Sequence, residues 1–147
     1  MEYQLPEPLG EQIYLVAQME DKYTLAKLKK LQLTADTSNL ITYVNNHPGT
    51  RQKEINRALN KQAATITNMI KRLESRNLLI RRIDPNNSRE KQVFLLKDGL
   101  DMVNKINEVT EEISDLLNPC VTDSGNVNIE AFYNNLLIAL QQLGIAE

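Results

Sequence analysis

The sequence "LLIRRIDPNNSREKQVFLL", residues 78–96, is where the hydrophobic pattern of this chain changes its period. Two segments rich in apolar and β-branched residues, 78–84 and 91–96, are separated by "PNNSR", whose residue types are typical of turns. On both sides of this stretch apolar residues recur at steps of three and four, which is typical of amphipathic helices. We therefore expect one β-hairpin with a charged tip inside an otherwise helical chain.

The helical pattern divides the rest of the chain into segments. Thr34 is the expected N-cap of a second helix, which "NNHPG" at 45–49 would stop. Thr50 is the expected N-cap of a third helix, and Gly99 marks the return from the hairpin to helix. The expected helices are residues 9–31, the segment after Thr34, a short one from near Thr50, residues 62–76, residues 100–117 and the segment from Ile129. A three-helix unit followed by a hairpin predicts a winged helix-turn-helix, so the fold class is mainly α with a small β-hairpin wing (α+β).

Composition places the chain among ordinary globular proteins. It has 147 residues, 41% of them hydrophobic and 24% charged, which suits one domain or one domain with an oligomerisation arm. Cys120 is the single cysteine, so an internal disulfide is excluded. The N-terminal sequence has no signal-peptide pattern, and no apolar run approaches the ~18 residues that span a membrane. We expect a soluble cytoplasmic protein without a membrane partner.

The charge is distributed unevenly along the chain. Residues 50–97 hold twelve Lys and Arg against four Asp and Glu, a net charge of +8, while the remaining residues sum to −10. A basic segment inside an acidic protein indicates a surface for a polyanion such as nucleic acid, although a solvated helical face has the same composition.

The segment 62–76 has the pattern of a recognition helix. Ile66, Met69, Ile70 and Leu73 fall on one narrow stripe, which would hold the helix on the core. The residues on or beside the opposite face, where a helix in the major groove would read bases and bind phosphates, are Lys61, Gln62, Ala64, Thr65, Thr67, Asn68, Lys71 and Arg72. An amide can pair with adenine, and methyl groups can contact thymine. Taken alone, the stripe is also compatible with an ordinary amphipathic surface helix.

Residues 49–99 resemble the DNA-binding core of the MarR family of bacterial transcriptional regulators. The resemblance rests on Gly49, Gln52, Glu54, Ile55 and Leu59, on "TIT" at 65–67, on "LLIRR" at 78–82, and on Asp84, Arg89, Val93, Leu95 and Gly99. It implies a winged helix-turn-helix at residues 34–99 and a helical dimerisation region at residues 1–33 and 100–147. It also implies further DNA contacts from the helix start and the wing, namely Thr50, Arg51, Arg81, Arg82, Asn87, Arg89 and Lys91.

Several positions depart from the family pattern. Asn77 stands where Gly usually follows the recognition helix, and Asn is the next residue to tolerate positive φ. Asn87 replaces a wing aspartate, so the tip arginine would be held less rigidly. Arg51 and Gln62 occupy positions where Ser or Thr caps are common, and Asp98 is expected to cap the long helix in place of the usual threonine at 96.

The resemblance implies a homodimer that binds a pseudo-palindromic operator in double-stranded DNA, with half-sites roughly 10 base pairs apart. The final helix is apolar over an arc wider than a lone terminal helix needs, which favours a dimer, although packing within one subunit gives the same pattern. The family also implies a cleft for a small-molecule effector, for which Tyr14, Tyr23 and Tyr43 are candidates; the alternative is that they are core or interface tyrosines.

An enzyme is not expected, because the one histidine, His47, lies in no catalytic or metal-binding motif, and no metal or cofactor is predicted. Cys120 has no base nearby in sequence, so an incidental thiol is favoured over a redox switch. The function predicted is a sequence-specific, homodimeric DNA-binding repressor, released by an effector. The alternative is a winged-helix interaction module, or antagonist, without its own operator.

Overall fold

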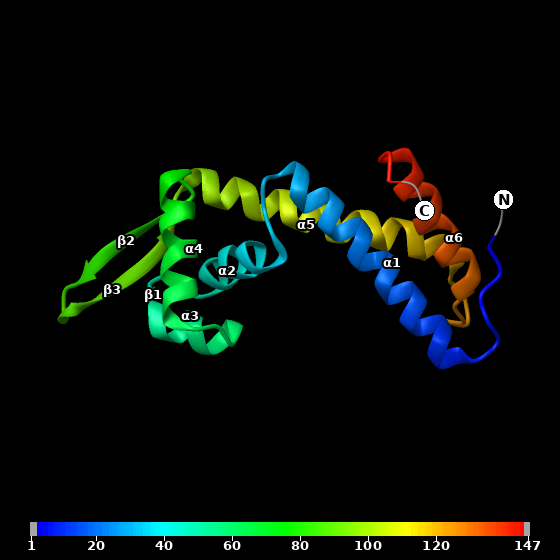
Figure 1. The fold of residues 1–147 in the computed structure, drawn as a ribbon, viewed down its shortest axis with the longest axis horizontal. Coiled ribbons are helices and arrows are strands. Elements are labelled where there is room, and N and C mark those ends of the chain that lie inside the picture. The colour runs from blue at the N-terminus through cyan, green and yellow to red at the C-terminus, as the bar shows by residue number, and fades with distance from the viewer. Residues whose placement is uncertain (1–2, 146–147) are drawn as a thin grey trace. The chain divides into compact units, whose positions relative to one another are not determined.

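The computed structural model describes residues 3–145, apart from the side chain of Ser88. Residues 1–2 and 146–147, at the two ends of the expected dimerisation region, lie outside the described residues. The described part contains six α-helices and a three-stranded antiparallel sheet with strand order β1-β3-β2, which confirms the predicted fold class (Figure 1). The elements are α1 (Leu9–Lys30), α2 (Ala35–Asn46), β1 (Thr50–Arg51), α3 (Gln52–Leu59), α4 (Ala63–Ser75), β2 (Leu79–Asp84), β3 (Asn87–Leu95), α5 (Lys97–Leu117), the short 3-10 helix η1 (Asn118–Cys120) and α6 (Ile129–Gln142).

The chain divides into two compact units. Residues 33–107 form one unit, which contains the sheet, α2, α3, α4 and the first half of α5. The described parts of residues 1–32 and 108–147 form the other, which contains α1, α6 and the second half of α5.

The hairpin of the 33–107 unit differs from its prediction in two respects. Strand β3 begins at Asn87 rather than at Lys91, because pairing with β2 continues to Asp84, opposite Asn87, past an irregularity between Ile83 and Asp84. A third strand was not predicted: Thr50 and Arg51 pair with Val93 and Gln92 of β3. Thr50 is consequently a strand residue and not the N-cap of α3, a position that Arg51 holds without a side-chain cap.

Helix ends in this unit follow capping chemistry. Thr34 is the N-cap of α2, as predicted, and forms a reciprocal capping box with Thr37. Asn77 adopts φ 61°, also as predicted, and the amides of Asn77 and Leu78 bond back to the carbonyls of Glu74 and Leu73. This is the Schellman arrangement, in which the left-handed residue lets the helix end and a strand begin within two residues. Asn60, at φ 53°, has the same backbone conformation after α3, which the sequence analysis missed.

The prediction that Gly99 marks the return to helix is wrong. Helix α5 already begins at Lys97, and Gly99 lies buried in its first turn. A Cβ on this residue would collide with the carbonyl oxygen of Leu78 and would lie 3.1 Å from its carbonyl carbon. Glycine is therefore required here because a helix and a neighbouring backbone meet at very short range. Asp98 lies inside this turn, not before it as a cap residue would.

The 1–32 and 108–147 unit has its own apolar core. Phe132, Tyr133, Leu136 and Leu140 of α6 are buried together with Met19 and Tyr23 of α1 and with Val109 of α5. The wide apolar arc of α6 is thus largely covered within the chain itself, which is the alternative that the sequence left open, and the arc no longer counts as evidence for a dimer. Among the large apolar residues of α6, Ile138 remains exposed.

Candidate nucleic-acid interface

Helices α3 and α4 form a helix-turn-helix pair joined by residues 60–62. The left-handed Asn60 closes α3, with the amide of Lys61 donating to the carbonyl of Asn56 at 3.0 Å. The chain then enters α4 through Gln62, whose carbonyl accepts the first helical bond from Ile66. Because Asn60 turns the chain within one residue, the second helix starts immediately and at a fixed angle to the first.

Helix α4 separates an apolar side from a polar side as predicted. Ile66, Met69, Ile70 and Leu73 are all buried. The exposed residues on or beside the other side are Lys61, Gln62, Ala64, Thr65, Asn68, Lys71 and Arg72. Within residues 3–145, no hydrogen bond or ion pair engages the side chains of Asn68, Lys71 and Arg72, so their polar groups are available to a ligand. Lys61 differs, since its ammonium lies 3.3 Å from the carboxylate of Asp36.

Thr67, another predicted contact residue, is hydrogen-bonded within the protein. Its hydroxyl donates to the backbone carbonyl of Ala63 at 2.9 Å and accepts a hydrogen bond from the side-chain amide of Gln52 at 2.6 Å. The Gln52 amide also donates to the Ala63 carbonyl at 3.3 Å. Gln52 thus connects the start of α3 to the start of α4, and Thr67 is half-buried in that connection. Its residue type alone could not distinguish this from a base contact.

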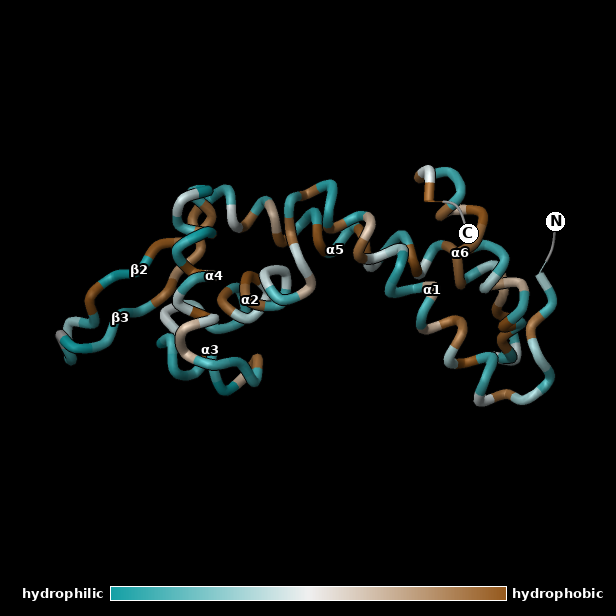
Figure 2. The backbone as a smooth tube through the Cα atoms, viewed as in Figure 1, coloured by the Kyte–Doolittle hydropathy of each residue, from teal (hydrophilic) through white to brown (hydrophobic). Residues whose placement is uncertain are grey.

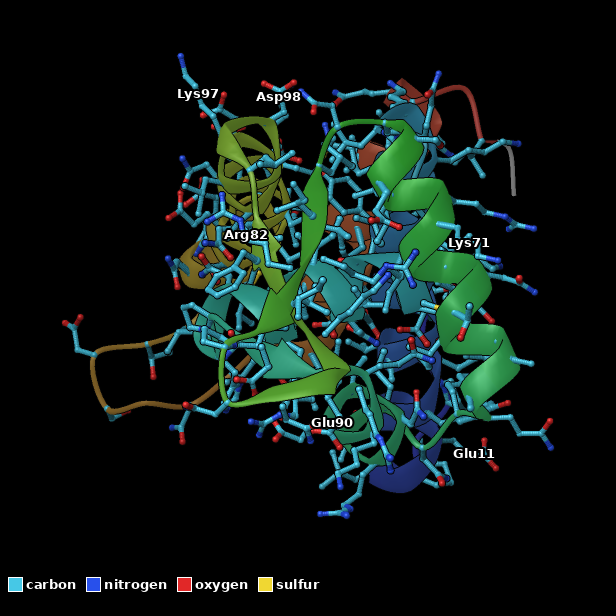
Figure 3. The ribbon with its side chains drawn as sticks, turned by 90° about the vertical axis from the view of Figure 1, so that its left-hand side faces the viewer. Glu11, Lys71, Arg82, Glu90, Lys97 and Asp98 are labelled. Atoms are coloured by element: carbon cyan, nitrogen blue, oxygen red, sulfur yellow. The ribbon has the colours of Figure 1, made fainter. Side chains whose placement is uncertain are left out.

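The wing is the β2–β3 hairpin, which extends past α4 and is polar towards its tip (Figures 1 and 2). Arg82, Arg89 and Lys91 are exposed along it. The Arg82 guanidinium lies 5.7 Å from the ring centre of Phe94, which supports the side chain from one side. Figure 3 looks onto the face that carries α4 and the wing, with Lys71, Arg82 and Glu90 labelled.

Arg81 and Arg51, both predicted DNA contacts, are already paired with carboxylates. The Arg81 guanidinium donates twice to one carboxylate oxygen of Glu74 on α4, at 3.1 and 2.8 Å, and so joins β2 to the recognition helix. Arg51 Nη2 donates to Asp84 Oδ2 at 2.5 Å, and its Nε lies 2.7 Å from Glu90 Oε2.

Two carboxyl groups around Arg51, those of Asp84 and Glu54, have lowered pKa values, which favours their charged forms. The backbone amide of Asn86 and the Arg51 guanidinium hold the pKa of Asp84 below its ordinary value, although the Asp84 side chain is only 3% exposed. The bond to Asp84 in turn raises the pKa of Arg51. The Thr50 hydroxyl, which donates to Glu54 at 2.9 Å, lowers the pKa of that carboxyl. Thr50 is itself buried, so it organises this cluster rather than facing solvent.

Asn87 acts on the backbone of the wing tip. Its side-chain oxygen accepts a bond from the amide of Arg89 at 3.1 Å, while Asp84 accepts one from the amide of Asn86 at 2.8 Å.

A hollow of about 270 Å³ lies beside the wing and is lined by Arg51, Gln52, Lys53, Arg81, Arg89, Glu90, Lys91 and Val93.

The three candidate effector tyrosines are divided between the two units. Tyr14 and Tyr23 lie nine residues apart on α1, about two and a half turns, so they project from opposite sides of the helix. Tyr14 is 62% exposed, whereas Tyr23 is 6% exposed and donates to Glu112 at 2.5 Å. Burial and this bond raise the pKa of Tyr23. Tyr43, in the other unit, stacks on His47 with ring centres 4.2 Å apart.

Neither a reactive thiol nor a metal cluster is found among the described residues. Cys120 is buried, which raises the pKa of its thiol, and Asn135 lies at hydrogen-bond range of its sulfur. In the described chain, no three His, Cys, Asp or Glu residues gather as a metal site would require. None of the helices there combines the length and apolar character needed to cross a bilayer.

Comparisons with known proteins agree with this architecture. A single-residue mutant of MepR from a multidrug-resistant S. aureus isolate is 20% identical with a TM-score of 0.74, covering 95% of this chain and 99% of that one. A MepR mutant from S. aureus bound to an oligodeoxyribonucleotide is 21% identical with a TM-score of 0.72, covering 94% and 99%. Apo MarR from E. coli is 22% identical with a TM-score of 0.63, covering 74% and 80%. No curated protein matches the sequence significantly.

The MarR family model matches residues 33–91, the segment that holds α2, α3, α4 and most of the wing. Residues 33–91 of this chain thus match the MarR family model, and the chain has the winged-helix fold of the MarR and MepR structures.

Proposed function

We propose that this protein is a sequence-specific transcriptional regulator that binds double-stranded DNA as a homodimer. The observation that carries the proposal is the exposed side of α4, where the side chains of Asn68, Lys71 and Arg72 have no partner among the described residues and lie beside a wing with exposed cations. A helix that offers an amide at its centre and cations around it suits major-groove reading, with the wing against the flanking backbone. A MepR mutant with this fold is bound to an oligodeoxyribonucleotide, which supports DNA as the ligand.

The dimer is supported by the 1–32 and 108–147 unit. Leu9 and Ile13 lie one helical turn apart on α1 and are 58% and 56% exposed, with Tyr14 beside them. Contiguous exposed apolar residues on a helix favour a protein contact. Two copies related by a two-fold axis would read half-sites roughly 10 base pairs apart. Leu9→Ser with Ile13→Ser should shift the chain to monomer in analytical ultracentrifugation; Leu25→Ser, at an exposed leucine further along α1, is the control.

The proposed regulator represses transcription by covering promoter DNA, and a small-molecule effector releases it from the DNA. Ethidium bromide in a MepR relative at 22% identity supports the presence of a ligand site in this fold. The direct measurement is transcription from a promoter that contains the recovered operator, with and without protein. Activation by the protein would refute repression while leaving DNA binding intact.

The test of DNA binding is selection of random-sequence duplexes by the purified protein at moderate salt. An enriched pseudo-palindrome is expected. If no sequence is enriched, the regulator function fails and an interaction module without its own operator becomes the better account.

Variants then assign the contacts on the recovered duplex. Asn68→Ala should cost about 1–3 kcal/mol on the recovered site and little on unrelated DNA. Arg89→Ala should weaken binding to all sequences and reduce the salt slope by about one unit, as loss of a phosphate contact does. Lys22→Ala removes an exposed cation from α1 and should change neither quantity.

A further inference from the structure

Arg51 occupies the junction of three elements of the DNA-binding unit. It lies in β1 opposite Gln92 of β3, directly before α3. Its guanidinium reaches Asp84 at the end of β2 and Glu90 on β3, and its Nη1 lies 3.8 Å from Glu54 on α3. The two wing strands and the start of α3 are therefore joined through one side chain.

The geometry leaves this guanidinium poorly suited to a phosphate. Two of its nitrogens face carboxylates at 2.5 and 2.7 Å, so a phosphate would have to displace Asp84 or Glu90. Displacing Asp84 would leave a carboxylate that is 3% exposed without its counter-charge, which is strongly unfavourable. The planar fork of Arg also matches this bridging role better than Lys could, because it can hold two carboxylates at once.

What Arg51 holds is directly connected to the wing tip. Glu90 lies between Arg89 and Lys91, two exposed cations of the wing. Asp84 accepts the amide of Asn86 in the connection between the strands. Fixing these two carboxylates fixes the backbone on both sides of the tip, and thereby the positions from which Arg89 and Lys91 extend.

We infer that Arg51 is a positioning residue: it anchors the wing to the start of α3 through Asp84 and Glu90 and so presents Arg89 and Lys91 to DNA, without contacting a phosphate itself. The inference rests on the DNA-binding function proposed above. It replaces the sequence-based expectation that Arg51 is a direct contact.

The first experiment is a double-mutant analysis of affinity for the duplex recovered by selection. Arg51→Gln should weaken binding on the order of 10-fold in the wild-type background, but less than about 2-fold when Arg89 and Lys91 are already Ala, because its effect passes through them. Lys71→Gln is the matched control, whose loss should be the same in both backgrounds. Equal losses for Arg51→Gln in both backgrounds would overturn the inference.

The variant Asp84→Asn should change DNA affinity in opposite directions, depending on whether Arg51 contacts a phosphate or positions the wing. If Arg51 were a phosphate contact restrained by Asp84, removing this negative charge would strengthen DNA binding. If Arg51 instead positions the wing through Asp84, the variant removes this link, and DNA binding should weaken.

A third measurement uses the free protein and needs no DNA. Arg51→Gln should accelerate amide hydrogen exchange in residues 85–91, while Lys71→Gln should not. Arg51→Lys keeps a cation beside the buried Asp84 but cannot span both carboxylates, so it should fold and show intermediate exchange and affinity even if Arg51→Gln fails to fold. Unchanged exchange in Arg51→Lys, with affinity equal to wild type, would refute the anchoring role. A wild-type protein that enriches no duplex would instead overturn the proposed function, and with it the presentation of cations to DNA.

Discussion

Gly99 provides a sharp test of how the recognition helix, the wing and α5 are packed. In an ordinary helix, replacing Gly by Ala stabilises the folded state by up to ~1 kcal/mol, because Ala has less backbone freedom to lose. Here the added Cβ would collide with the carbonyl oxygen of Leu78 and would also lie 3.3 Å from Cβ of Leu95. Both neighbours are held in place, since the Leu78 carbonyl accepts the amide of Leu96 at 3.0 Å.

The loss of stability expected for Gly99→Ala follows from these contacts. Overpacking a well-filled site costs about 1–3 kcal/mol, and strain on the bond at Leu78 adds roughly 1 kcal/mol. Subtracting a gain of at most ~1 kcal/mol leaves Gly99→Ala destabilised by about 2 kcal/mol. Gly10→Ala in α1 is the matched control, because a Cβ there meets nothing within 4 Å and should leave stability unchanged or raise it.

The assay is urea unfolding followed by circular dichroism. Both variants and the wild type are compared at one chain concentration, because association of subunits stabilises the folded state by mass action. The reasoning fails if Gly99→Ala unfolds at the same urea concentration as wild type or at a higher one. It also fails if Gly10→Ala loses as much stability as Gly99→Ala, since the short backbone approach would then not be the cause.

Three further predictions concern a cap, a carboxylate and a thiol. Thr34→Ala should lose about 1 kcal/mol of unfolding free energy in urea, while Thr34→Ser, which keeps the capping oxygen, should not. Because the folded-state pKa of Asp84 is depressed, its contribution to stability is present above the ordinary carboxyl pKa of about 4 and is lost as pH falls through the folded value. The stability difference between wild type and Asp84→Asn should therefore narrow on acidification below about pH 4, and a constant difference would contradict the assignment. Cys120 should react with a thiol reagent far more slowly in the native protein than in urea, because burial both shields it and raises its pKa; equal rates would show an accessible thiol.

The parts of the fold that depend on local pattern were predictable from the sequence. The spacing of Ile66, Met69, Ile70 and Leu73 defines the buried side of α4, because a helix repeats its faces at a fixed period. Thr34 and Asn77 were predictable for a similar reason: capping and left-handed geometry depend on the residue and its immediate neighbours.

The features that were missed depend on partners distant in the sequence. The two-residue strand β1 exists because Thr50 and Arg51 meet β3, and nothing near position 50 encodes that pairing. The carboxylate partners of Arg51 at positions 84 and 90 could likewise not be read from the residues around position 51. For the same reason the residue type of Thr67 could not reveal its bond with Gln52.

The peptide at Leu78 has a mechanical consequence. Its amide bonds to the last turn of α4, its carbonyl accepts the amide of Leu96 directly after β3, and the same carbonyl abuts the first turn of α5. Three elements thus share one peptide group, with no side chain between them that could change rotamer and absorb a shift. A displacement of the first turn of α5 would therefore press directly on the peptide that follows the recognition helix, because close-packed interiors transmit strain.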